Sequence, residues 1–304
     1  MFPVFQALIP VILSIAAGYG FRRYGGIPPA SWKHLSYITY YLFVPALEIN
    51  VLANKPFDGL PWLALISAVT SVLFLVTICL LIWQKWLRPV QPTTFTSMYQ
   101  GGVRFNTFIA LVLAAQLYGD EGVAAVAVVS AVMILLINVL CIAIFSTYVG
   151  STQVRLKTIG HDLITNPLLV GCLIGLGLNF SGVGIGGSFE SFVELMGNAA
   201  LPMGLMAVGA GLQLDRLRGN WEVVGTASIF QLLLKPLLAA IAVNVWGLQG
   251  LLAAALILCF TVPTAPSSYI LSIQKGGDSQ TMAAIITVQT LLSALSIPIV
   301  VGMV

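Results

Sequence analysis

The chain has 304 residues, of which 59% are hydrophobic and 8% are charged, and its formal net charge is +3. Soluble globular proteins carry about 25% charged residues, so this composition excludes a cytosolic enzyme, a secreted disulfide scaffold and a disordered chain. It predicts a single compact integral membrane domain, and so small a net charge gives no reason to expect nucleic acid as a partner.

Apolar runs separated by polar breaks predict ten membrane-spanning helices. Each run has roughly the 20 residues that cross a hydrocarbon core, and the runs lack the strict alternation of barrel strands. The first run has no small-residue cleavage site, so we expect it to be retained as a span. In chain order the predicted spans are 2–21, 33–53, 61–83, 94–118, 121–148, 163–180, 188–213, 221–246, 248–272 and 279–302.

Basic residues predict how these helices are oriented. Cytoplasmic loops carry an excess of lysine and arginine. Lys55 is the only basic residue in the loops after even-numbered helices, so the loops after odd-numbered helices are expected in the cytoplasm. Both termini are then expected on the periplasmic or extracellular side of a bacterial-type inner membrane. The basic residues of the odd-numbered loops are Arg22, Arg23, Lys33, Lys85, Arg88, Arg155, Lys157, Arg216, Arg218 and Lys275.

The two halves of the chain repeat one another at an offset of about 158 residues. Pro45 then falls near Pro202, and Trp62 near Trp221, which open the third and eighth spans. Because each half has an odd number of helices, the second half enters the membrane upside down, as in transporters built from inverted repeats. We therefore expect repeats at 1–149 and 162–304, joined by a short cytoplasmic connection at 150–161.

Each repeat has an interrupted fourth helix. Gly101 and Gly102 interrupt the fourth span, and Pro263 and Pro266 interrupt the ninth. Glycine loosens a helix through its backbone freedom, and proline removes an N–H group and collides with the preceding turn. In inverted-repeat transporters such broken helices cross near the midplane and bind the substrate there.

Polar side chains accompany both interruptions. The offset places Asn106 on Thr264, and Ser267 follows in the ninth span. A broken helix leaves a new N-terminus with free N–H groups and partial positive charge, which favours an anion. Asn106, Thr264 and Ser267 are therefore candidate substrate-binding residues, and the expected ligand is a small carboxylate.

The segments RFNTFIALVLAAQLYGDEG, VPTAPSSYILSIQKGGD, TLLSALSIPIV and FVPALE resemble the auxin efflux carrier family, which includes plant auxin exporters and bacterial malonate-transporter-like carriers. The resemblance implies a fold like that of sodium/proton antiporters and bile-acid symporters. Helices 1, 2, 6 and 7 would form a scaffold, and helices 3–5 and 8–10 a moving transport domain. It also implies a homodimer through the scaffold. Asn106 then matches the asparagine that family members place beside a substrate carboxylate, where helices 4 and 9 cross. Plant members have proline before this asparagine, where this chain has Phe105.

Charged residues within spans are costly and call for a role. Arg104 is a candidate carboxylate ligand, or else a structural partner of Glu48 or of a backbone carbonyl. Glu48 is a candidate counter-ion or proton carrier. Lys235, in the eighth span, pairs with a carboxylate of the transport domain or extends along its helix toward the interface.

These features predict a secondary carrier of small organic anions that works by alternating access. The alternative is a sodium- or proton-coupled organic-anion symporter of the bile-acid type. A membrane enzyme would need a nucleophile, a metal cluster or an acid pair, and the sequence suggests none of these. No cofactor is expected, and no metal site either, because the cysteines lie in apolar runs without CxxC spacing. They are Cys79, Cys141, Cys172 and Cys259.

Overall fold

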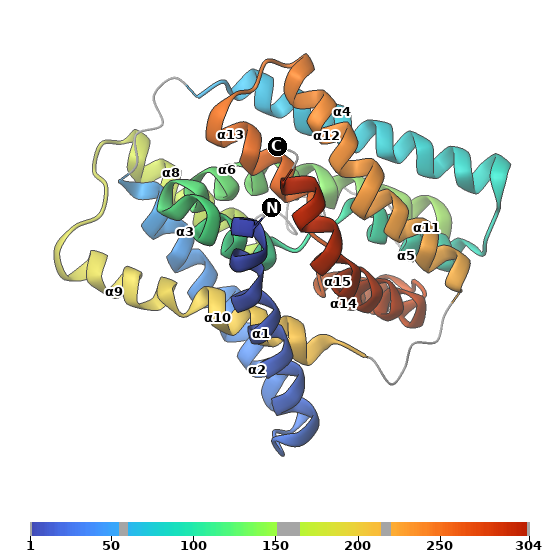
Figure 1. Cartoon of the computed structure of the whole chain (residues 1–304), viewed down its shortest axis with the longest axis horizontal. Helices are drawn as coiled ribbons and strands as arrows, with labels where there is room; N and C mark the ends of the chain where they lie inside the picture. The colour runs from blue at the N-terminus through green and yellow to red at the C-terminus, as the bar shows by residue number, and fades with distance from the viewer. Residues whose placement is uncertain (1, 55–59, 151–164, 214–219, 303–304) are drawn as a thin grey trace.

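A computed structural model describes residues 2–54, 60–150, 165–213 and 220–302. All regular elements in these ranges are helices, as the sequence predicts, and Figure 1 shows how they are arranged. The predicted connection at 150–161 lies outside the described residues apart from Gly150. Several of the basic loop residues lie outside them as well, namely Lys55, Arg155, Lys157, Arg216 and Arg218.

The described part of the first half contains six α-helices and two π-helical segments. In order they are α1 (Phe2–Tyr24), α2 (Pro29–Ile38), η1 (Thr39–Phe43), α3 (Val44–Ala53), α4 (Trp62–Ile82), η2 (Trp83–Leu87), α5 (Pro92–Val103) and α6 (Thr107–Val149).

The second half continues with α8 (Pro167–Phe180), α9 (Gly187–Asn198), α10 (Ala200–Gly211), α11 (Trp221–Ile229), η4 (Phe230–Leu234), α12 (Lys235–Val245), α13 (Gly250–Thr261), α14 (Ser267–Lys275) and α15 (Ser279–Val301). The segments η1 and η4 each run directly into a helix whose second residue is proline, Pro45 or Pro236. Proline clashes with the carbonyl four residues earlier, and the wider π-turn accommodates it without ending the helix.

Within the described ranges, six helical segments are long and apolar enough to cross a membrane: Ala30–Ala53, Trp62–Leu87, Pro92–Val149, Gly187–Gly211, Trp221–Val245 and Ser279–Val301. Large apolar side chains also cover the outside of the molecule. Leu63 is 80% exposed and Val245 is 71% exposed. An apolar surface this extensive is unfavourable in water but is the surface that lipid requires. The chain is therefore an integral membrane protein.

The long helix α6 is a tight helical hairpin centred on Gly119, which has φ 62° and ψ −156°. A Cβ atom on Gly122 would lie 2.9 Å from the main-chain oxygen of Ala114, eight residues earlier, so the chain has turned back on itself. The ring centroids of Phe95, on α5, and Tyr148 lie 4.6 Å apart, so the antiparallel pairing extends from α6 to α5. The sequence predicts this division, with spans at 94–118 and 121–148.

The helices pack in two groups. In the first, α3 packs on α8 and α9, and α1 packs on α10; in the second, α6 packs on α13, α5 on α11 and α15, and α4 on α12. Figure 1 shows α4 beside α12, and α1 crossing α10. The GxxxG residues Gly171 and Gly175 belong to the first group, because Cβ atoms there would lie 2.7 Å from Pro45 Cα and 2.9 Å from Leu52 Cβ. This motif therefore serves internal packing of α8 on α3.

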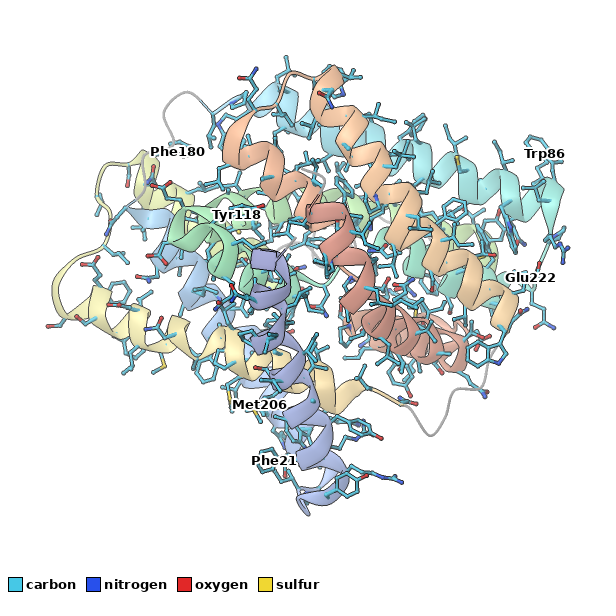
Figure 2. The ribbon with its side chains drawn as sticks, viewed as in Figure 1. Phe21, Trp86, Tyr118, Phe180, Met206 and Glu222 are labelled. Atoms are coloured by element: carbon cyan, nitrogen blue, oxygen red, sulfur yellow. The ribbon has the colours of Figure 1, made fainter. Side chains whose placement is uncertain are left out.

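Polar contacts join the ends of helices in the first half of the chain to the ends of helices in the second half. Arg88, after the third predicted span, forms an ion pair of 3.0 Å with Glu222, before the eighth. Asp278 N–H donates to the carbonyl of Thr93 at 3.1 Å, which joins the end of the ninth span to the start of the fourth. At the other ends, Asn54 Nδ2 donates to the carbonyl of Ile185 at 2.9 Å. Figure 2 shows Trp86 and Glu222 at one side of the molecule and Phe180 at the opposite side.

Candidate functional site

Two helix breaks cross inside the second packing group. The first is an extended segment between α5 and α6, where Arg104 has φ −73° and ψ 157° and Asn106 has φ −93° and ψ 98°. The second lies between α13 and α14 and contains Pro263 and Pro266. The N–H of Asn106 donates to the carbonyl of Pro263 at 2.8 Å, so the two breaks are in direct contact.

The first break differs from the sequence prediction. Gly101 and Gly102 lie inside α5, which continues to Val103. A Cβ atom on Gly101 would lie 2.7 Å from Ile285 Cγ2, and one on Gly102 would lie 3.1 Å from Leu80 Cδ1. The two glycines therefore let neighbouring helices approach α5 closely, and the break comes after them.

Asn106 ends the first break by capping α6. Its Oδ1 atom accepts hydrogen bonds from the N–H groups of Phe108 and Ile109 at 3.1 and 3.4 Å. N–H groups only donate, so the acceptor at this end of the amide is the oxygen and the Nδ2 donor is at the other end. Asn106 is fully buried, and Nδ2 has no hydrogen-bond partner among the described residues.

The carbonyl end of α5 is satisfied by donors from other helices. Thr264 Oγ and Gln289 Nε2 both donate to the carbonyl of Gly101 at 2.9 Å, and Gln289 Oε1 accepts from Thr264 N–H at 3.0 Å. The hydroxyl of Thr264 is thus engaged in holding the crossover together. Gln289 has no counterpart in the sequence prediction, because its distance along the chain from both breaks hides its position.

Lys235 supplies a positive charge to the same helix end. It is fully buried, and its Nζ donates to the carbonyl of Val103 at 3.1 Å and to Gln231 Oε1 at 2.7 Å. Gln231 Nε2 in turn donates to the carbonyl of Val262, at the end of α13, at 2.6 Å. Lys235 therefore neither extends to the interface nor pairs with a described carboxylate. It stabilises the partial negative charge where α5 ends.

The two serines that open α14 face different surroundings. Ser267, the predicted ligand, is exposed, whereas Ser268 is fully buried and its Oγ has no described partner. The Nη1 atom of Arg104 is also buried without a described partner. Arg104 makes no ion pair with Glu48 in the described ranges, so their predicted structural pairing is absent from this structure.

Glu48 lies in the first packing group, on α3. It is fully buried, and Cys172 on α8 is the polar neighbour of its carboxyl group; neither carboxylate oxygen makes a hydrogen bond of good geometry with a described residue. Its Oε2 faces α8, where a Cβ atom on Gly171 would lie 2.7 Å away. The counter-ion interpretation therefore lacks a partner for Glu48 in the part of the chain described.

The crossover has an excess of positive charge and of hydrogen-bond donors. The carbonyl ends of α5 and α13 are satisfied by Lys235, Gln231, Gln289 and Thr264, as described above. The N-terminal ends of α6 and α14 also meet here, and they bring partial positive charge. Beside them are three buried donors without described partners, on Arg104, Asn106 and Ser268. This arrangement favours an anionic group with several acceptor atoms, such as a carboxylate.

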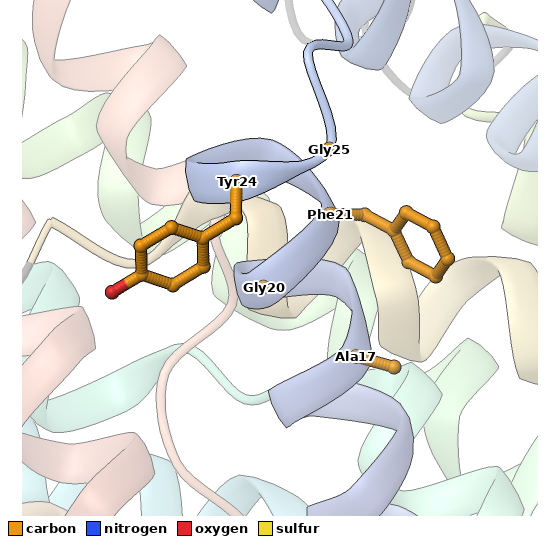
Figure 3. A pocket seen from close by; sticks show the side chains of 5 residues that line it. All are labelled: Ala17, Gly20, Phe21, Tyr24 and Gly25. Carbon is orange, nitrogen blue, oxygen red and sulfur yellow. The ribbon is translucent and has the colours of Figure 1, made fainter.

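The rest of the described structure offers no stronger ligand site. No group of three or more His, Cys, Asp or Glu side chains in the described ranges could hold a metal ion. A shallow groove on α1 is lined by Ala17, Gly20, Phe21, Tyr24 and Gly25. Figure 3 shows that it contains no ionisable side chain other than the Tyr24 phenol, and that the two rings point to different sides of the helix. The crossover is therefore the better candidate.

Comparison with known proteins places the whole chain among transporters. A family model described as "Membrane transport protein" matches residues 3–301. An uncharacterized transporter of Methanothermobacter thermautotrophicus is 22% identical over 298 residues, which are 97% of this chain and 96% of the relative. An uncharacterized transporter of Methanocaldococcus jannaschii is 23% identical over 308 residues, with 98% of this chain and 97% of the relative covered.

Proposed function

The chain belongs to the membrane transport protein family, the family of the auxin efflux carriers, and from this premise we propose that it is a secondary carrier of small organic anions. It is a membrane transporter and not an enzyme. The substrate binds at the crossover of the two broken helices, and alternating access exposes that site to each side of the membrane in turn.

The proposed architecture is ten membrane passes in two inverted repeats. Three observations support it. The hairpin at Gly119 divides the longest helical segment into two passes, and the breaks at 104–106 and 262–266 both fall in the fourth pass of a half. The contacts Arg88–Glu222 and Asn54–Ile185 each join ends that this topology puts on one side. The first packing group then acts as the scaffold, and the second as the moving transport domain.

The excess of positive charge and of unpaired donors at the crossover is the observation that carries the proposal. Buried polar groups normally find partners, so three buried donors without one at a single place indicate a ligand that supplies acceptors. A neutral or cationic ligand would leave Arg104 and the helix N-termini uncompensated. A carboxylate satisfies the donors and also the positive field.

The test is current recording from proteoliposomes on a solid-supported membrane. A jump in carboxylate concentration in sodium-free buffer should give a current. Because a neutral solute gives no current, the matching amide is followed by uptake of the radiolabelled compound, and we expect no uptake. Equal transport of the amide would refute an anion site. If no other ion travels, each cycle moves net charge, worth about 2.3 kcal/mol per 100 mV for each elementary charge.

Coupling to sodium or protons is the second candidate function. A current that requires sodium would support the symporter alternative. Uptake without current would indicate proton coupling, and Glu48 is then the residue to test. Its carboxyl group is fully buried and makes no ion pair in the described ranges, which suits a group that is neutral for part of the cycle.

A further inference from the structure

A line of buried polar side chains runs between α5 and α14. We call it the polar seam; it consists of Ser97 and Gln100 on α5 and Ser268 and Ser272 on α14. All four are fully buried. The other two half-helices of the crossover, the start of α6 and α13, bury mainly apolar side chains, such as Leu111 and Leu256.

The bond from Ser97 to a main-chain carbonyl fixes the directions of the other hydrogen bonds in the polar seam. Ser97 Oγ donates to the main-chain oxygen of Asp278 at 2.8 Å, because a carbonyl can only accept. The bond of 3.5 Å between Ser97 and Ser272 then uses the proton of Ser272. Ser272 Oγ is left to accept from Gln100 Nε2, at 2.9 Å. Gln100 must therefore keep its amide nitrogen on Ser272 and present Oε1 elsewhere.

The free oxygen of Gln100 is an unpaired buried acceptor. Oε1 has no hydrogen-bond partner among the described residues. Gln100 lies in the last turn of α5, and its carbonyl accepts from the N–H of Arg104 at 2.9 Å, so the two residues are one helical turn apart. The acceptor therefore lies one turn from the proposed carboxylate site.

The register of the two half-helices brings Ser268 to the same place. They run antiparallel, since Thr93 pairs with Asp278 and Asn106 pairs with Pro263. Thr264, four residues before Ser268, bonds to the carbonyl of Gly101, and Ser272, four residues after it, bonds to Gln100. Ser268 is therefore level with the last turn of α5, beside Gln100. The site thus combines donors on Arg104, Asn106 and Ser268 with one fixed acceptor on Gln100.

We propose that this site selects carboxylates that carry a hydrogen-bond donor of their own, such as a hydroxyl or N–H group close to the carboxyl group. This inference rests on the proposed function, because it assumes that the carboxylate binds at the crossover. Gln100 is the residue that determines specificity. A ligand without the donor leaves Oε1 buried and unpaired, which lowers its affinity.

Matched pairs of acids test the proposal. Dissociation constants are measured by calorimetry on the purified full chain for lactate and propionate, and for malate and succinate. The two members of each pair differ by one hydroxyl group. The hydroxy acid should bind about tenfold more tightly than the acid without the hydroxyl. In Gln100→Met that ratio should fall to about one.

Two further variants serve as the control and as the second test. Gln84→Met removes another buried glutamine, whose hydrogen bonds among the described residues are to Val90, and should leave the ratio unchanged. Ser272→Ala keeps Gln100 but removes the bond that fixes its orientation, so the ratio should fall to about threefold. If Gln100→Met fails to fold, the affinity ratio measured with Ser272→Ala tests the role of Gln100 instead.

The outcomes separate the two proposals. Equal binding of hydroxy and deoxy acids by the native chain would overturn the specificity of Gln100 and leave the anion carrier standing. A preference that persists in both Gln100→Met and Ser272→Ala would overturn it as well. Failure of all four acids to bind, with an amide or a cation binding instead, would refute the proposed function itself.

Discussion

Substitutions of Asn106 can separate its role as a helix cap from its role as a ligand. The cap consists of two hydrogen bonds to Oδ1, at 3.1 and 3.4 Å. Asn106→Ala removes both and should lower the free energy of unfolding by about 1 kcal/mol. It also removes the Nδ2 donor, and loss of a hydrogen bond to a charged group costs about 1.5–3 kcal/mol, or roughly 10- to 150-fold in affinity.

Asn106→Asp keeps an acceptor for the cap but replaces the donor with an oxygen. We expect this variant to stay folded and to lose binding at least as fully as Asn106→Ala, because its carboxylate also repels an anion. The control is Asn220→Ala. Asn220 caps α11 through the same pair of bonds, at 3.1 and 3.3 Å, away from the crossover. It should show the loss of stability without the loss of binding.

The assay combines thermal unfolding in detergent with calorimetric titration of a carboxylate. Folded Asn106→Asp protein that binds the carboxylate as tightly as the native chain would refute the ligand role. An equal loss of affinity in Asn106→Ala and Asn220→Ala would show that the effect of Asn106 comes from helix capping alone.

Three other substitutions or fusions test the remaining features. Lys235→Met leaves the carbonyl of Val103 buried and unpaired, so thermal unfolding should show a loss of about 1–3 kcal/mol or more; unchanged stability would show that Lys235 does not hold the end of α5. Glu48→Gln should fold, and if Glu48 carries a proton it should abolish the pH dependence of uptake, whereas pH dependence equal to that of the native chain excludes this role. A periplasm-active reporter should be active after Val304 and inactive after Gly150, and the reverse result would invert the orientation.

The sequence predicts the positions of the helices better than the reason for each break. The prolines of the ninth span mark its break correctly, because proline cannot complete the helical hydrogen bonds. Glycine carries no such constraint. Gly101 and Gly102 serve close packing, and the helix ends where Asn106 can cap the next one. Asparagine before an apolar run is a known start signal for a helix, and it would have located the break.

Contacts between distant segments account for the other differences. Ser267 and Ser268 are adjacent, and only the rotation of α14 about its axis decides which one faces the crossover. Lys235 is paired with main-chain carbonyls, and carbonyls have no mark in a sequence. Gln100 and Gln289 lie in ordinary polar positions until the fold brings them to the two broken helices. Such residues can be identified only after the packing of the helices is known.

The short helices α13 and α14 also have a consequence for synthesis of the protein. With 12 and 9 residues, neither is long enough to cross a hydrocarbon core of about 30 Å. The polar groups of α14 bond to Ser97 and Gln100, which the ribosome has made well over a hundred residues earlier. The α13–α14 segment therefore depends on the first half of the chain for partners of its buried polar groups. The two halves, if produced as separate fragments, would depend on each other to become membrane-integrated.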